Sequence, residues 1–339
     1  MTSRTHAPIP ADLGKVRSLR RTTSDDGFFT LCAIDHLSDF QILLDSDPTR
    51  VSYRSTVDAK GRLIAALADS VSGFLVDPRY SYAQSVLSDA IPSSSGVMVS
   101  LEDDGYLGVD TDRATRMRDG WGVRQAKLAG ADVVKLLWFY RPESTFAQAQ
   151  RDLVTSLAAE AADWAIPLVV EPIWHPLAGE DATAPEWRIA RAQGIVQSGK
   201  LAVELGADVL KTEFPGDLRS NSGVERAGDA LAELDESIDV PWVILSAGVA
   251  FDEFTEQAEL SGKAGASGWL AGRSIWREAG SATTETEWTE GLEMARSRLA
   301  TLTEITKKYG RPFLPSEKTD STPDRWYEGY HQLSADDIA

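Results

Sequence analysis

Short apolar runs alternate with amphipathic stretches along most of the chain. Most of the runs are rich in β-branched or aromatic side chains, and each run predicts a buried strand. The eight runs are 28–34, 73–76, 96–100, 133–139, 166–170, 208–211, 241–245 and 267–271. The intervening stretches, such as 144–164 and 185–205, repeat apolar residues at helical spacing and predict helices that pack on a sheet.

This alternation predicts the fold class. Strands that alternate with helices form parallel sheets, and eight such units favour a single-domain (β/α)₈ TIM barrel over an open doubly wound sheet. No glycine-rich dinucleotide fingerprint follows the first strand, which further disfavours the doubly wound fold. We expect an N-terminal extension with a short helix over 1–27, the barrel domain over 28–308 and a polar tail over 309–339.

Composition narrows the classes of partner. The net charge of -18 argues against nucleic acids and acidic membranes as partners, but a small phosphorylated substrate needs only a local cationic pocket. Cys32 is the only cysteine, and the chain has neither an N-terminal apolar signal segment nor an apolar run long enough to span a membrane. These features predict a cytoplasmic protein. They do not determine its oligomeric state, and a homo-oligomer is one of the possibilities.

Two lysines occupy matching positions in two predicted strands. The sequence Gly-Ala-Asp-Val-Val-Lys ends at Lys135, and Gly-Ala-Asp-Val-Leu-Lys ends at Lys211. A buried ammonium group is costly unless another group pairs with it or the chemistry uses it. Glu171 ends the strand between them, and a barrel of this type carries its catalytic groups at these strand ends. The three residues therefore predict either one catalytic chamber or an ion cluster that braces the barrel.

A catalytic chamber of this composition suits carbonyl chemistry. A lysine beside a second cation in an apolar wall is expected to have a lowered pKa and to be nucleophilic. An adjacent carboxylate such as Glu171 can move the protons that Schiff-base formation requires. Asp35 follows the first strand, and taken alone it is typical of a cap or turn residue.

The last two strand ends carry a phosphate-binding pattern. Ser246-Ala247-Gly248 follows the seventh strand, and Gly272-Arg273 follows the eighth. Loops at these two positions, with backbone N–H groups at a helix start, form the usual phosphate site of barrel enzymes. The Arg273 guanidinium would add a cationic fork. The alternative is that the glycines only permit tight turns and that Arg273 faces solvent.

Metal ligands are sparse in the sequence. Of the four histidines, only His36 and His175 lie near strand ends, too few for a catalytic zinc site. Asp77, Glu102 and Asp104 could hold Mg²⁺ through carboxylates, although acidic residues at such positions are typical of solvated loops. We therefore expect neither a metal nor another cofactor.

Several segments together resemble the class I tagatose-1,6-bisphosphate aldolases, a family that also includes sulfofructose-phosphate aldolases. The similarity runs from about residue 28 to 308 in the same order. The segments are AIDH at 33–36, ADVVK at 131–135, VEP at 170–172, DVLKTE at 208–213, ILSAGV at 244–249 and GWLAGRSIW at 268–276.

The resemblance implies a cofactor-free aldolase that reversibly cleaves a ketose (bis)phosphate into dihydroxyacetone phosphate and an aldehyde such as glyceraldehyde 3-phosphate. It implies that Lys211 forms the Schiff base with the C2 carbonyl and that Glu171 acts as acid and base. Lys135 and Asp35 would assist. The positions that would hold the phosphate of the dihydroxyacetone half are Ser246, Gly248, Gly272 and Arg273.

One departure from the family pattern leaves the far end of the sugar open. Members often carry Asp-Gln-Arg where this chain has Asp35-His36-Leu37, so one arginine contact at the mouth is missing. A sulfofructose-phosphate aldolase with the same lysine is therefore an alternative. A non-catalytic barrel that senses a metabolite is another, although such a protein has no need to keep both lysines and Glu171.

Overall fold

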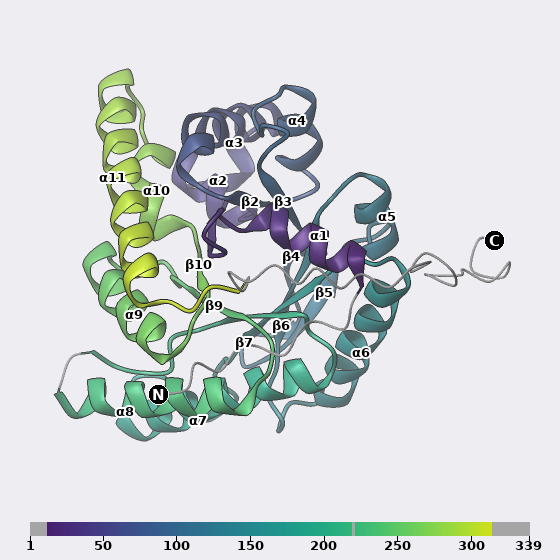
Figure 1. Ribbon diagram of the computed structural model, residues 1–339, viewed down its shortest axis with the longest axis vertical. Helices are drawn as coiled ribbons and strands as arrows, with labels where there is room; N and C mark the ends of the chain where they lie inside the picture. Colours follow the sequence, from purple (N-terminus) through teal and green to yellow (C-terminus); the bar gives the residue numbers. More distant parts are fainter. Residues whose placement is uncertain (1–11, 219–220, 314–339) are drawn as a thin grey trace, which may run out of the picture.

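Each of the eight apolar runs forms a strand of one parallel sheet that closes on itself (Figure 1). The computed structural model describes residues 12–218 and 221–313. Around the barrel the strands follow the order β1-β10-β9-β8-β7-β6-β3-β2, which confirms the predicted (β/α)₈ fold. The strands are β1 Phe29–Ala33, β2 Gly73–Val76, β3 Gly96–Ser100, β6 Val133–Phe139, β7 Leu168–Ile173, β8 Val209–Thr212, β9 Trp242–Leu245 and β10 Gly268–Ala271.

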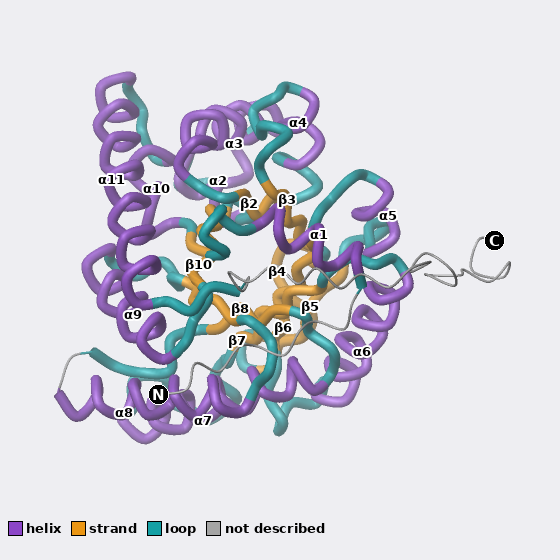
Figure 2. The backbone as a smooth tube through the Cα atoms, in the orientation of Figure 1, coloured by secondary structure: helices purple, strands orange, loops and turns teal. Residues whose placement is uncertain are grey.

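Helices surround the barrel and connect successive strands (Figure 2). The α-helices are α1 Leu13–Thr22, α2 Ser38–Leu44, α3 Tyr53–Leu67, α4 Tyr82–Leu87, α5 Val123–Leu128, α6 Ala147–Asp163, α7 Pro185–Glu204, α8 Asn221–Ser237, α9 Phe251–Ala264, α10 Arg273–Gly280 and α11 Glu285–Tyr309. Two short 3₁₀ helices are Pro48–Arg50 and Ala68–Ser70. The sequence pattern did not predict α2 and α10. Within the described ranges, no helix combines the length and the apolar character that a membrane crossing requires.

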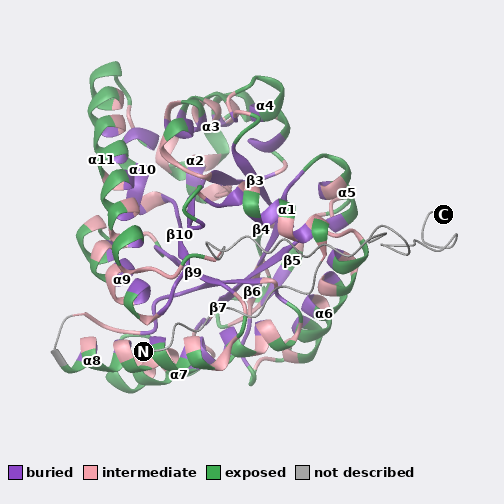
Figure 3. Ribbon diagram, in the orientation of Figure 1, coloured by how far each residue is buried: buried purple, intermediate pink, exposed green. Residues whose placement is uncertain are grey.

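Buried apolar side chains form two clusters, one between the strands and the helices and one inside the barrel. Figure 3 shows that the barrel strands are largely buried. Val133, Val169 and Val209 belong to the inner apolar cluster. Side chains in a strand alternate between its two faces, so the residue two positions further on also points inward. In these three strands that residue is Lys135, Glu171 or Lys211. The polar trio therefore stands directly above the apolar interior, toward the C-terminal ends of the strands.

Helix α1 closes the opposite end of the barrel, where it lies across the strands in Figure 1. Leu19 inserts into the inner apolar cluster and is fully buried. Lys15 Nζ lies 2.8 Å from a carboxylate oxygen of Asp208, just before β8, and Arg21 Nε lies 2.9 Å from Asp132, just before β6. With this end closed, a ligand has access from the C-terminal ends of the strands.

A β-hairpin that the sequence pattern did not predict follows β3. It consists of β4 Glu102–Val109 and β5 Asp112–Met117, which pair antiparallel. The Thr115 hydroxyl joins the hairpin to β6, since it donates to the Leu137 carbonyl at 2.8 Å and accepts from the Phe139 N–H at 3.0 Å. The hairpin is thereby fixed beside the C-terminal end of the barrel.

A fully buried ion pair ties the ends of β1 and β2 to helix α3. Lys60 Nζ lies 2.5 Å from Asp77 Oδ2, and neither side chain has any exposed surface. The same ammonium donates to the Ile34 carbonyl at 2.9 Å, next to Asp35. Asp77 also accepts the backbone N–H of Tyr80. Asp77 is thus a structural anchor and not a magnesium ligand.

We predict that Lys60→Met destabilises the protein by about 3–5 kcal/mol, because it leaves the Asp77 carboxylate buried without its cation. Urea unfolding followed by circular dichroism measures the change. Lys263→Met is the matched control, since Lys263 pairs with Glu259 at 2.6 Å on the surface, where solvent screens the pair and its loss should change stability little. Equal effects of the two substitutions would contradict the structural role of Lys60.

Candidate active site

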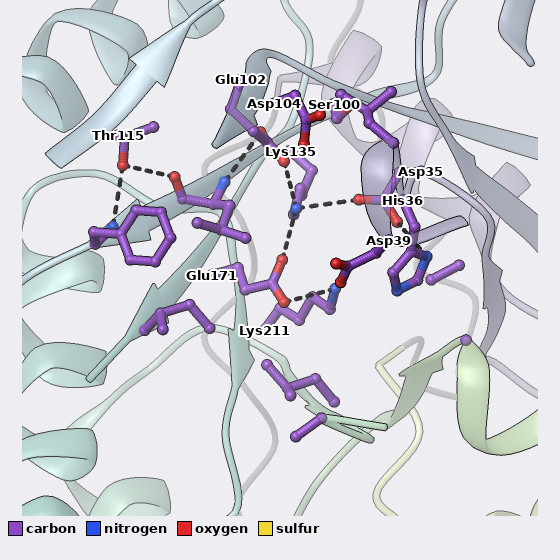
Figure 4. Close-up of a pocket in the computed structure, with 18 of the residues that line it drawn as sticks. Asp35, His36, Asp39, Ser100, Glu102, Asp104, Thr115, Lys135, Glu171 and Lys211 are labelled. Atoms are coloured by element: carbon purple, nitrogen blue, oxygen red, sulfur yellow. Dashed lines mark hydrogen bonds and ion pairs between the residues drawn. The ribbon is translucent and has the colours of Figure 1, made fainter. Parts of the chain in front are cut away.

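A cavity of about 500 Å³ opens at the C-terminal ends of the strands, a size that suits a small-molecule ligand. Charged side chains from neighbouring strands converge on it (Figure 4). All eight site residues named from the sequence line this cavity: Asp35, Lys135, Glu171, Lys211, Ser246, Gly248, Gly272 and Arg273.

The Glu171 carboxylate bridges the two lysines. Its Oε1 lies 2.9 Å from Lys211 Nζ, and its Oε2 lies 2.7 Å from Lys135 Nζ. All three side chains are buried. Burial alone would raise the pKa of Glu171, but the two ammonium groups outweigh it and hold the pKa below the ordinary value. Glu171 is therefore an ionised carboxylate, able to accept a proton.

Lys135 is surrounded by carboxylates. Its Nζ lies 2.6 Å from Glu102, 2.7 Å from Glu171 and 3.2 Å from Asp35. Burial alone would lower the pKa of Lys135, but the three negative charges raise it well above the ordinary value. The expectation of a lowered pKa is wrong for this lysine, because carboxylates separate it from other cations. Lys135 is a permanent cation.

Asp35 belongs to this cluster and is not merely a turn residue. Burial disfavours its charged form, yet Lys135 outweighs that effect and the pKa of Asp35 falls well below its usual range. His36, the next residue, has its Nδ1 3.8 Å from Asp35 Oδ1. Burial lowers the pKa of His36 to about 4, although Asp35 opposes the shift. His36 is thus neutral at neutral pH.

Glu102 also belongs to the cluster, although the sequence pattern predicted a solvated loop residue or a magnesium ligand at this position. Glu102 begins β4, where its Oε1 contacts Lys135 and its Oε2 accepts the Leu137 N–H at 3.1 Å. The position of Glu102 in the sequence, two residues after Ser100, could have indicated this contact. Ser100 in β3 is paired in register with Lys135 in β6. An acidic residue at a strand end in this register lies within reach of the neighbouring strand's cation.

The loops after β9 and β10 face the cavity with main-chain groups and one arginine. Gly248 has a φ of 71° in a tight turn. A side chain at Gly272 would place its Cβ 2.7 Å from the Ala33 carbonyl oxygen, so only glycine fits there. Helix α10 begins at Arg273, and this arginine does not simply face solvent, because it donates to Asp39 Oδ2 at 2.7 Å. An anion at this loop would therefore compete with Asp39.

The remaining magnesium candidates are engaged elsewhere. Asp104 accepts a hydrogen bond from the Ser38 hydroxyl at 3.0 Å, and Glu102 and Asp77 each hold a lysine. Across residues 12–218 and 221–313, no group of three or more His, Cys, Asp and Glu side chains is arranged to hold a metal ion.

Comparisons with known proteins identify the family of this chain. The family model "DeoC/LacD family aldolase" matches residues 36–278. The tagatose 1,6-diphosphate aldolase of Lactococcus lactis subsp. lactis is 26% identical over 306 residues, which cover 85% of this chain and 91% of that protein. These matches confirm the resemblance drawn from the sequence.

Solved structures share the fold. An archaeal fructose-1,6-bisphosphate aldolase, whose catalytic lysine is covalently bound to a carbinolamine intermediate, is 18% identical, with a TM-score of 0.57 over 87% of this chain and 99% of that one. Fructose-bisphosphate aldolase from Plasmodium falciparum is 12% identical, with a TM-score of 0.64 over 92% of this chain and 99% of that one.

The neutral state of His36 predicts a specific pH dependence of stability. An unfolded histidine takes up a proton below about pH 6.5, whereas His36 in the folded protein does so only near a pKa of about 4. Between these values acid favours the unfolded state, by up to about 1.4 kcal/mol per pH unit. Asp35 and Glu171 still stabilise the fold in this window, because their depressed pKa values keep them ionised until lower pH.

Urea unfolding at pH 6.5 and at pH 4.5 tests this dependence. We expect the free energy of unfolding to fall more between these pH values in the wild type than in His36→Gln, which has no titrating ring. Parallel losses in the two proteins would show that His36 is not held neutral.

Proposed function

The chain belongs to the DeoC/LacD family of aldolases, and we propose that it is a class I aldolase whose Lys211 forms a Schiff base with a ketose phosphate. The observation that carries this proposal is the Glu171 carboxylate, held between two buried lysines at the mouth of the barrel. The covalent lysine described for the archaeal aldolase is consistent with it.

Lys211 is the better nucleophile of the two lysines. Lys135 is committed to three carboxylates, whereas Lys211 forms a described ion pair with Glu171 alone. Glu171 Oε1, at 2.9 Å, is placed to take a proton from the Lys211 ammonium and free the amine. The amine then adds to the C2 carbonyl of the ketose, and loss of water gives the iminium ion.

Carbon–carbon cleavage follows from the iminium ion. A base removes the proton of the C4 hydroxyl, the C3–C4 bond breaks, and its electron pair flows into the iminium to give an enamine while the aldehyde leaves. Protonation at C3 and hydrolysis then release dihydroxyacetone phosphate and restore Lys211. Glu171 is the acid and base in this sequence, and Asp35 assists from the other side of Lys135.

Lys135 acts as a fixed positive charge. It keeps Glu171 and Asp35 ionised and oriented, so both carboxylates can accept protons at neutral pH. Removing this charge would raise both carboxylate pKa values, so a larger fraction of each group would already be protonated and unable to accept a proton from Lys211.

The loops after β9 and β10 hold the phosphate of the dihydroxyacetone half. Ser246, Gly248 and Gly272 offer hydroxyl and main-chain groups, and Arg273 exchanges Asp39 for the phosphate. A tagatose-1,6-bisphosphate-like ketose fits this scheme, with glyceraldehyde 3-phosphate as the second product. The name of the Lactococcus lactis relative supports that substrate class.

Cleavage assays test the proposal. With D-tagatose 1,6-bisphosphate or D-fructose 1,6-bisphosphate, we expect the purified protein to release dihydroxyacetone phosphate, measured with a coupled dehydrogenase, and to keep its activity in EDTA. Lys211→Met should lower kcat/KM at least about a thousandfold, because it removes the nucleophile. Lys200→Met, on the exposed face of α7, is the control and should match the wild type. Activity that survives Lys211→Met, or that EDTA abolishes, would contradict the proposal.

A further inference from the structure

The hairpin β4–β5 brings a second arginine, Arg113, to the cavity that holds Lys211. The hairpin follows β3 and is fastened to β6. In the closed strand order, β3 lies four places from β9, and β6 lies four places from β10. Arg113 therefore stands across the barrel mouth from the loops that carry Ser246, Gly248 and Arg273.

Arg113 is held in a defined orientation. Its Nε–H donates to the Asp110 carbonyl at 2.9 Å, and its backbone N–H donates to His175 Nε2 at 3.2 Å. The guanidinium lies 4.6 Å from the centre of the Tyr106 ring and 5.8 Å from that of Phe139. A cation already fixed in this way loses little conformational freedom when it binds an anion.

The charge of Arg113 is not neutralised by its neighbours. The four aspartates of the hairpin all have other partners: Asp103 pairs with Arg118, Asp104 accepts from Ser38, Asp110 accepts from Tyr106, and Asp112 accepts from Ser144 and Thr145. In the part of the chain that the structure describes, no carboxylate pairs with the Arg113 guanidinium. Arg273, across the cavity, has Asp39 at 2.7 Å. An unpaired cation that lines a cavity of a protein with net charge -18 is a binding group for an anion.

We propose that Arg113 binds the anionic group at the end of the ketose chain remote from the first phosphate. The hairpin and the phosphate loops then hold a doubly anionic substrate on both sides of Lys211. The anion is a phosphate or a sulfonate, since both present tetrahedral oxygens to a guanidinium fork. This inference rests on the proposed function, which places the first phosphate at Arg273.

A purely structural Arg113 makes different predictions. In that case the guanidinium only packs the hairpin against Phe139, and its loss lowers thermal stability and affects every substrate equally. A substrate-binding Arg113 affects only substrates that carry the second anion.

The test compares three variants on three substrates. Arg113→Gln removes the proposed contact, and Arg116→Gln is the matched control, because Arg116 lies exposed on the same strand and does not line the cavity. Arg273→Gln removes the opposite contact. The substrates are D-tagatose 1,6-bisphosphate, D-tagatose 1-phosphate, and the 1-phosphate of 6-deoxy-6-sulfo-D-tagatose. Steady-state kcat/KM and melting temperature are measured for each protein.

We expect Arg113→Gln to lower kcat/KM for the doubly anionic substrates by about ten- to a hundredfold and to change that for D-tagatose 1-phosphate less than about twofold. Arg273→Gln should lower kcat/KM for all three, since all keep the C1 phosphate. The comparison of the two doubly anionic substrates identifies the C6 anion. Arg113 recognises the anion of the substrate that the wild type cleaves with the higher kcat/KM and whose kcat/KM falls further in Arg113→Gln.

An equal loss on all three substrates in Arg113→Gln, or a similar loss in Arg116→Gln, would overturn the inference. If the wild type cleaves both tagatose phosphates but Arg113→Gln leaves their ratio unchanged, the role of Arg113 is wrong while the aldolase proposal stands. If the wild type cleaves none of the substrates and borohydride traps no adduct with dihydroxyacetone phosphate, both proposals are wrong.

Discussion

The shared Glu171 carboxylate is the interaction on which the site depends. Neighbouring strands lie about 4.8 Å apart, so the inward side chains of β6, β7 and β8 necessarily meet. A charged side chain can be buried at this point only if a neighbouring side chain of opposite charge pairs with it. Two lysines and the three carboxylates of Asp35, Glu102 and Glu171 form this cluster. In the proposed mechanism, the transfer of a proton from Lys211 to Glu171 removes the positive charge at Lys211 and leaves the net charge of the cluster unchanged. When Glu171 returns that proton to the departing water, the iminium at Lys211 again faces an ionised carboxylate, so the cluster is electrostatically complementary to the proposed Schiff base.

The rest of the fold keeps this cluster in place. Helix α1 closes one end of the barrel, and the buried Lys60–Asp77 pair fixes the backbone that leads into Asp35. The hairpin supplies Glu102, without which Lys135 would lose its shortest contact. These elements make the difference between the two lysines, because they give Lys135 three carboxylates and leave Lys211 with Glu171.

Much of the site was predictable, because strand alternation is a local property. Val-Val-Lys and Val-Leu-Lys place both lysines two residues beyond an inward valine, so their burial followed from the sequence.

Glu171 was predicted at the end of its strand, but β7 continues through Pro172 to Ile173. The pairing of β7 with β8 stops at Val170, so at Pro172 the strand β7 is paired with β6 alone. Proline has no backbone N–H to donate, and a strand tolerates this where it has a neighbour on only one side. The hairpin was missed because the acidic start of β4 and its two glycines are typical of a loop. The Arg273–Asp39 pair joins positions 234 residues apart, which no local pattern reveals.

Identification of the covalent lysine tests the central claim most directly. Sodium borohydride added to the wild-type protein with dihydroxyacetone phosphate should reduce an iminium to a stable adduct, and peptide mass spectrometry then locates the label. The account predicts the label on Lys211, because Glu171 can take its proton while three carboxylates keep Lys135 charged. A label found on Lys135 would contradict this assignment of the two lysines.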